Sequence, residues 1–260
     1  MPSYEPIFVI AGAVLLAIPL LLLWFIVRQR RHAPALRRIA AWDALRGLVG
    51  RALEEGKRVH LSLGRSGVGG EQTAVVSAAL DVQRYLARES AGMSASSPQG
   101  SAETVLLTTV ADPLLMLAAQ NTLYRAYRDR GLAADYDGTQ VQLVTPDPLA
   151  YAVGAQDQID DERTAANVMV GHLGDEYLLL GETGAERDLL QVAGSDVLNT
   201  QALTTSTAGH VLLGEELFAA GAYLTRRPAL IASLQVQDVL RVTMVIAILV
   251  GVVVKSLGLI

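Results

Sequence analysis

Two long apolar runs, one at each end of the chain, constrain this protein more than any other feature. Residues 7–27 contain no charged side chain, and a helix of that length spans about 30 Å, the thickness of the hydrocarbon core of a bilayer. Pro19 interrupts the run, but membrane helices tolerate proline as a kink. We therefore expect residues 7–27 to form a first transmembrane helix.

The second run covers residues 239–260 and is less uniform. It contains Arg241 and Lys255, which lie near its ends, where long cationic side chains can reach the membrane interface. One alternative is a buried terminal helix of a soluble domain. Residues 242–254 are apolar on every side of a helix, which favours a second transmembrane helix.

Charges beside the first run predict its orientation. Five arginines follow it within eleven residues, whereas residues 1–6 carry Glu5 alone. By the positive-inside rule, residues 1–6 lie outside the cell, both termini are outside, and the main domain is cytoplasmic. No basic segment precedes the run, and no small-residue cleavage pattern follows it, so we expect a retained anchor and not a signal peptide.

Composition excludes several classes for the rest of the chain. The 260 residues are 51% hydrophobic and 18% charged and include no cysteine. This excludes intrinsic disorder, a disulfide scaffold, thiolate metal sites and a cysteine nucleophile. The net charge of −5 argues against nucleic-acid binding.

Residues 28–56 are expected to form a basic juxtamembrane segment with an amphipathic helix over 34–56. Its apolar face includes Ile39, Trp42 and Leu45. Such a helix either lies along the inner leaflet or covers the core of the domain. Arg38 and Arg46 intrude on the edges of the apolar face, which favours the core.

Strand-like and helix-like segments alternate over residues 57–238. Strands are expected at residues 58–63, 104–110, 140–145, 167–172, 189–193 and 210–214. Helices are expected at residues 71–88, 113–130, 148–162, 176–186 and 216–224, and a polar loop at 90–102. Short apolar strands without polar alternation, separated by helices, predict a three-layer, Rossmann-like α/β domain with a mostly parallel sheet.

Charge is divided along the chain. Residues 28–65 carry ten basic and three acidic side chains, whereas residues 103–196 carry sixteen acidic and five basic ones. The basic part suits the anionic inner leaflet. The acidic part is expected to be a solvated surface, with binding of a basic partner as the alternative.

The glycine-rich segment after the first strand is the main candidate for ligand binding. Backbone N–H groups in such a strand-to-helix turn bind phosphate in many proteins. The segment lacks the Lys and Ser/Thr of a phosphate-binding loop and the third glycine of the dinucleotide fingerprint, and Glu71 adds negative charge. A purely steric role for the glycines therefore stays open. The candidate residues are Gly64, Ser66, Gly67, Gly69 and Gly70.

Further candidates follow later strands. Thr109, Asp112 and Asp147 are expected at the carboxyl ends of strands, where ligands bind in open parallel sheets. Because Asp112 and Asp147 each precede a proline, helix capping explains them equally well.

Catalytic and metal-binding patterns are weak. Ser66 lacks the second glycine of a nucleophile elbow, and Glu182 with Glu186 fits a solvated helix face. The histidines are dispersed, and His172 near Asp175 and Glu176 is the best pairing for a metal. We therefore assign no catalytic residue, no metal ligand and no cofactor.

Several strings resemble a family of uncharacterised bacterial two-span membrane proteins with a cytoplasmic domain of unknown function. The most distinctive strings are GDEYLLLGETGA at 174–185 and GEELFAAGAYL at 214–224. The resemblance implies a domain anchored in the bacterial inner membrane. It implies no activity and no functional residues.

Three functions remain open. The first is an assembly or scaffold component of a bacterial membrane complex, acting as a homo-oligomer or with other subunits in the lipid bilayer. The second is a sensor that binds a nucleotide or another small phosphorylated metabolite at the glycine-rich turn. The third is an enzyme of unknown reaction type that uses Asp112, Asp147 or Glu182 as an acid or base.

Overall fold

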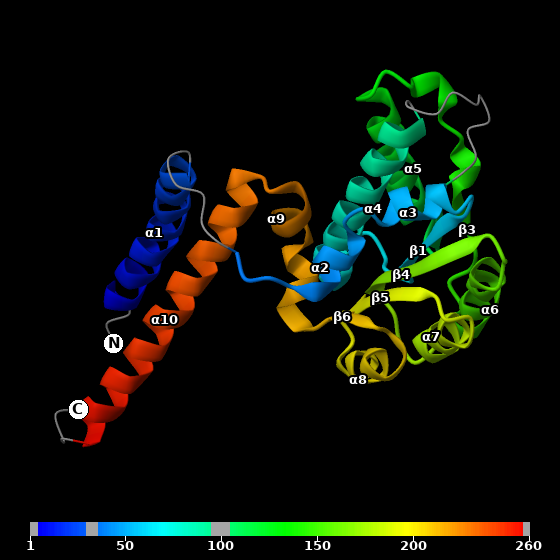
Figure 1. Ribbon diagram of the computed structural model, residues 1–260. Coiled ribbons are helices and arrows are strands. Elements are labelled where there is room, and N and C mark those ends of the chain that lie inside the picture. The colour runs from blue at the N-terminus through cyan, green and yellow to red at the C-terminus, as the bar shows by residue number, and fades with distance from the viewer. Residues whose placement is uncertain (1–4, 30–35, 95–104, 257–260) are drawn as a thin grey trace. The chain divides into compact units, whose positions relative to one another are not determined.

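The computed structural model describes residues 5–29, 36–94 and 105–256 (Figure 1). The chain divides into two compact units. A helical unit joins Met1–Arg37 with Arg226–Ile260, and an α/β unit comprises Arg38–Thr225. The basic segment 28–56, which we expected to be separate from the α/β domain, therefore falls largely within the α/β unit.

The helical unit consists of two long helices that pack side by side, α1 (Glu5–Gln29) and α10 (Pro228–Ser256). Among the described residues, one helical segment, Pro228–Val252, is long and apolar enough to cross a membrane. It begins well before residue 239, where we expected the second span. In α1 the described apolar segment is shorter, Leu15–Arg28, so the first span stays a prediction.

A six-stranded sheet forms the centre of the α/β unit. Every pairing is parallel, and the strand order is β3-β2-β1-β4-β5-β6. The predicted α/β fold with a mostly parallel sheet is thus confirmed, and its order is that of Rossmann domains. The strands are β1 (Arg58–Gly64), β2 (Leu106–Val110), β3 (Val141–Leu143), β4 (Thr164–His172), β5 (Leu190–Ser195) and β6 (His210–Leu212).

Helices cover both faces of this sheet (Figure 1). On one face lie α2 (Ala40–Leu45), α3 (Leu48–Glu54), α4 (Thr73–Ser94), α5 (Pro113–Arg128) and α9 (Ala220–Thr225). On the other lie α6 (Pro148–Ile159), α7 (Tyr177–Glu186) and α8 (Leu198–Thr207). Short 3-10 helices are η1 (Gly70–Gln72), η2 (Ala133–Asp135), η3 (Gly138–Gln140) and η4 (Gly214–Ala219).

The alternation of side chains along the strands divides the interior into two cores. In β1, Val59, Leu61 and Leu63 belong to the larger core, beneath α4 and α5. On the opposite face, Met169 and Ala193 pack with Tyr151 in a smaller core beneath α6 and α7. Because successive residues of a strand point to opposite faces, His60 and Ser62 of β1 face the smaller core.

The expected helix over 34–56 is wrong as a single element, and its first two residues lie outside the described ones. The chain forms α2 and α3 instead, because Gly47 adopts the left-handed region at φ 71° between them. Trp42, Leu45 and Val49 are fully buried in the larger core. The apolar face therefore covers the core and not a lipid leaflet.

Two other expectations change. Helix α4 continues to Ser94, into the loop expected over residues 90–102, and residues 95–102 of that loop lie outside the described ones. Helix α8, with the sequence LNTQALTTST, was not expected at all. The many threonines of this segment have low helix propensity, so its sequence did not predict a helix. Two of them, Thr200 and Thr204, are buried in the structure.

Candidate functional site

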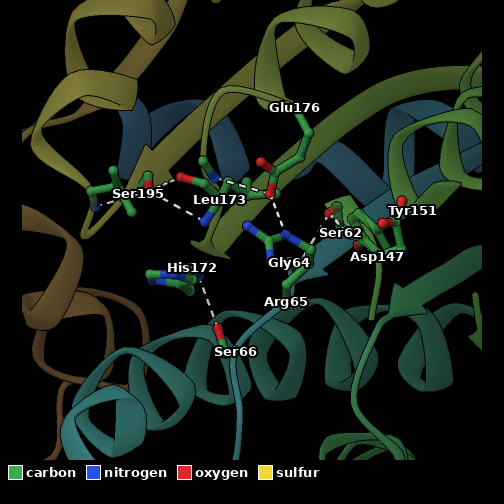
Figure 2. Close-up of polar contacts among 12 residues, drawn as sticks. Ser62, Gly64, Arg65, Ser66, Asp147, Tyr151, His172, Leu173, Glu176 and Ser195 are labelled. Atoms are coloured by element: carbon green, nitrogen blue, oxygen red, sulfur yellow. Dashed lines mark hydrogen bonds and ion pairs between the residues drawn. The ribbon is translucent and has the colours of Figure 1, made fainter. Parts of the chain in front are cut away.

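The carboxyl ends of β1 and β4 define the topological switch point of the sheet. These strands are neighbours, and their connections lead to opposite faces, to α4 on one side and to α7 on the other. In open parallel sheets ligands bind at this point. Two loops meet here, one over residues 64–70 after β1 and one over residues 172–176 after β4 (Figure 2).

Close backbone contact joins these two loops. The N–H of Arg65 donates to the carbonyl of His172 at 2.8 Å. A Cβ atom on Gly64 would lie 2.5 Å from that same carbonyl oxygen, and one on Gly171 would collide with the carbonyl of Leu63. Gly64 is therefore required for the packing of β1 against β4, as the steric alternative proposed.

Ser66 also stabilises the contact between the two loops, and its side chain is fully buried. Its hydroxyl accepts from the backbone N–H of His172 at 2.8 Å and donates to the carbonyl of Leu63 at 3.3 Å. The first hydrogen bond ties the loop after β1 to the end of β4, and the second fixes Ser66 against the end of β1. In this arrangement the hydroxyl of Ser66 serves packing and is not presented to solvent.

The glycine-rich turn is closed at one end and open at the other. The N–H of Gly67 donates to the side-chain oxygen of Gln72 at 2.6 Å, so the chain itself satisfies this amide. Gly69 and Gly70 are exposed, and no atom lies within 4 Å of a Cβ built on either one. Their φ angles of 112° and 69° require glycine. The turn therefore leaves room for a ligand at Gly69 and Gly70 only.

A largely buried ion pair occupies the switch point. The Nε of Arg65 donates to a carboxylate oxygen of Glu176 at 2.5 Å, and the N–H of Gly174 donates to the same oxygen at 3.0 Å. Burial alone would raise the pKa of Glu176, but these donors hold the pKa below its usual value. Glu176 is therefore ionised at neutral pH. The sequence pattern gave no sign of this pair, whose members lie 111 residues apart.

His172 pairs with a different residue from the ones we expected. Its Nδ1 lies 2.9 Å from a carboxylate oxygen of Asp196, after β5, and both side chains are about a quarter exposed. Asp196 was not among our candidates, whereas Glu176 binds Arg65. A carboxylate oxygen can only accept, so Nδ1 of His172 donates to Asp196.

Asp112 and Asp147 both cap helices. A carboxylate oxygen of Asp112 accepts from the N–H of Leu115 at 2.8 Å, and one of Asp147 accepts from the N–H of Ala150 at 2.9 Å. A proline follows each cap at the first helical position. The capping alternative thus accounts for both residues, and no hydrogen bond among the described residues joins either to the glycine-rich turn.

Thr109 belongs to a buried hydrogen-bond chain that crosses the smaller-core face of the sheet. The polar residues of this chain occupy β1, β2, β4, β5 and α6, in strands that we expected to be without polar alternation. The hydrogen bonds measure 2.7–3.3 Å. In order, the chain runs through Ser62, Tyr151, Thr109, His60, Asn167 and Gln191.

From Thr109 to Gln191, the members of this chain donate in the same direction. The side-chain oxygen of Asn167 can only accept, so Nδ1 of His60 donates to it and Nε2 accepts from Thr109. Gln191 ends the chain by donating to the carbonyls of Gly181 and Thr207, at 3.0 and 3.1 Å. Burial lowers the pKa of His60 to about 4, so the ring is neutral near pH 7.

An acidic groove of about 180 Å³ lies between α6 and α7. Glu186 lines it, whereas Glu182, which we expected to share a solvated helix face with Glu186, does not. No cluster of three or more potential metal ligands occurs within the described part of the chain. The lining residues are Gln156, Asp157, Asp160, Thr183 and Glu186.

Comparison with known proteins yields one family. A family model described as "Domain of unknown function (DUF6754)" matches residues 6–260. No curated protein and no solved structure matches the chain. The expected relationship to a domain of unknown function is confirmed, and the match extends over both units.

Proposed function

The chain belongs to the DUF6754 family, and we propose that it is a membrane-anchored assembly component whose α/β unit associates with a second copy of the chain. The contact is made through an exposed apolar surface beside the edge strand β3. No catalytic step is required for this role. The membrane anchor, the contact surface and the choice of partner are supported as follows.

Exposed apolar side chains of α10 support the anchor. Val242, Met244 and Ile248 are each 60–64% exposed, and only 6% of an apolar 18-residue stretch within Pro228–Val252 is buried. A helix with apolar residues exposed on all sides is stable in hydrocarbon and unfavourable in water. In α1, Leu15, Leu16 and Leu20 are also exposed, which supports a second span.

The arginines after α1 support a cytoplasmic position for the α/β unit. Arg28 lies over the ring of Trp24, 5.0 Å from its centroid, and indole and guanidinium groups both prefer the membrane interface. Four further arginines follow by residue 38. The positive-inside rule then gives a two-span protein of the bacterial inner membrane with both termini outside.

The single observation that carries the assembly role is the β3-edge surface. Its five residues are 43–65% exposed. Leu143 lies in β3, which pairs on one side with β2, and the other four lie on α5 and α6, the helices before and after this strand. Neither residues 113–124 of α5 nor residues 148–156 of α6 contain a charged side chain. The members of the surface are Leu114, Leu117, Leu143, Leu149 and Val153.

A second copy is the partner that fits this surface best. An edge strand presents unpaired N–H and C=O groups, and two identical edges can pair about a twofold axis. The uncharged surface allows this approach without repulsion between like charges. The opposite edge differs, because Glu215 and Glu216 lie between its exposed apolar residues Leu213 and Phe218.

The test is self-association of the full chain in nanodiscs or detergent, measured by mass photometry and cross-linking. We expect dimers, and we expect Leu117→Lys with Val153→Lys to weaken the dimer at least about tenfold, because each lysine would be buried at the interface. Leu198→Lys, on an exposed position of α8, is the matched control and should leave the dimer unchanged. A monomeric wild-type protein, or a dimer indifferent to both lysines, would refute the proposal.

A further inference from the structure

The switch point already holds an anion, and this anion belongs to the chain. The carboxylate of Glu176 is bound by the Arg65 guanidinium and by the N–H of Gly174, and its side chain is only 3% exposed. Guanidinium and backbone N–H groups are also the donors that proteins use for phosphate. Figure 2 shows the Arg65 guanidinium directed at the Glu176 carboxylate.

Gly174 allows the close approach of this anion. A Cβ atom there would lie 2.7 Å from the second carboxylate oxygen of Glu176 and 3.4 Å from a terminal nitrogen of Arg65. Any larger residue would therefore displace the carboxylate from its donors. At Gly174 the absence of a side chain lets the carboxylate lie against the backbone N–H.

Arg65 keeps donors beyond the one that Glu176 uses. The ion pair is made through Nε, and the Arg65 side chain is 22% exposed. A guanidinium carries five N–H donors and binds phosphate through two of them at once. Gly69 and Gly70 lie in the open part of the turn that follows the carboxyl end of β1.

We propose that Arg65 and Gly174 form a binding site for a diphosphate-bearing small molecule, and that the Glu176 carboxylate is a built-in competitor displaced by the ligand. One phosphate takes the position of the carboxylate on Arg65 and Gly174. The other reaches the open amides of Gly69 and Gly70. The displaced carboxylate turns to solvent beside Asp175, which is exposed.

This arrangement predicts weak binding by the wild-type protein and tighter binding once the competitor is neutralised. Glu176→Gln keeps the size of the side chain but removes its charge, so Arg65 loses its internal partner. The variant leaves three other acidic residues unchanged. Glu71 follows the first loop, Asp175 lies on the second, and Asp196 pairs with His172.

The experiment measures pyrophosphate and ADP binding to the full chain in nanodiscs by calorimetry, with inorganic phosphate for comparison. We expect Glu176→Gln to bind pyrophosphate at least about tenfold more tightly than the wild type, and Glu176→Gln with Arg65→Gln to lose that gain. Asp161→Asn is the matched control. It makes the same carboxylate-to-amide change in an ion pair of Asp161 with Arg58 and Arg163, away from the site, and should not alter binding.

A second measurement needs no variant. Pyrophosphate should protect Arg65 of the wild-type protein from an arginine-modifying reagent, as read by mass spectrometry, while Arg163 stays reactive. Equal affinity of wild type and Glu176→Gln, or no protection of Arg65, would overturn the inference. Both readouts are independent of dimer formation, so the two proposals can fail separately.

Discussion

The two faces of the sheet are built on different principles. On the α4 and α5 face, β1 contributes Val59, Leu61 and Leu63 to an aliphatic core. On the α6 and α7 face, the same strand contributes His60 and Ser62 to the hydrogen-bond chain. Aliphatic packing tolerates substitutions of similar volume, whereas a buried polar chain is stable only when every member keeps its partner. Buried side chains on one face therefore stabilise the fold by filling space, and those on the other face do so by keeping their hydrogen-bond partners.

The largest effect is expected on the aliphatic face. Leu61→Ala should lower the free energy of unfolding by about 4 kcal/mol, because it removes buried methylene groups and leaves a cavity. Urea unfolding of the full chain, followed by tryptophan fluorescence, measures this loss. Leu198→Ala, at a position 78% exposed, is the control, and an equal loss in both variants would contradict the comparison.

On the polar face, the free energy of unfolding should fall as the pH is lowered. The pKa of His60 is about 4 in the folded protein against 6.5 for an imidazole exposed to water, so the unfolded state binds more protons between these pH values. The corresponding stability is fully present above pH 6.5, and about 3 kcal/mol is lost as the pH falls to 4. Burial is the main cause, and Arg58 adds a smaller effect.

Comparing the wild type with His60→Gln isolates this contribution, since carboxylates titrate in the same range in both proteins. The variant should show a shallower dependence of unfolding free energy on pH between 4 and 6.5. Parallel curves would mean that His60 is not buried in its neutral form.

The next largest effect is expected when a buried hydroxyl of the polar face is replaced by a methyl group. Thr109→Val keeps the shape but removes the donor to Nε2 of His60, and we expect a loss of about 2 kcal/mol from the unsatisfied ring nitrogen. Thr205→Val, at an exposed position of α8, supplies the comparison. If the buried swap were as neutral as the exposed one, the polar face would behave like the aliphatic one.

The smallest effect is expected at the start of the chain of hydrogen bonds. Tyr151→Phe removes the hydroxyl that bonds Ser62 at 2.7 Å and should cost about 1 kcal/mol, a typical net value for one hydrogen bond. Tyr124→Phe, on the exposed side of α5, should be silent. Thermal unfolding of the two variants side by side gives the answer.

The aliphatic face could be predicted from the sequence and the polar face could not. Runs such as VLLTTV at 105–110 predict buried strands, and the Asp-Pro pairs at 112 and 147 predict helix starts, because the cause of each lies within a few residues. Arg65 and Glu176, or His60 and Asn167, lie more than 100 residues apart. Their pairing depends on which strands become neighbours, and no local pattern carries that information.

The same limit explains the errors at short range. We expected His172 to meet Asp175 or Glu176 because they follow it closely, but β4 ends beside β5, and Asp196 of the next connection lies nearer. The break between α2 and α3 depends on one left-handed glycine, Gly47, within an otherwise helical pattern.

The shared direction of the hydrogen bonds from Thr109 to Gln191 has a consequence for folding. These residues lie on the neighbouring strands β2, β1, β4 and β5, and each acceptor receives its hydrogen bond only if the adjacent strand is already in place. A sheet in which one strand is missing or shifted by a residue leaves a buried donor or acceptor without its complement. The four central strands should therefore assemble and separate together, with amide hydrogens across β2, β1, β4 and β5 exchanging as one cooperative group.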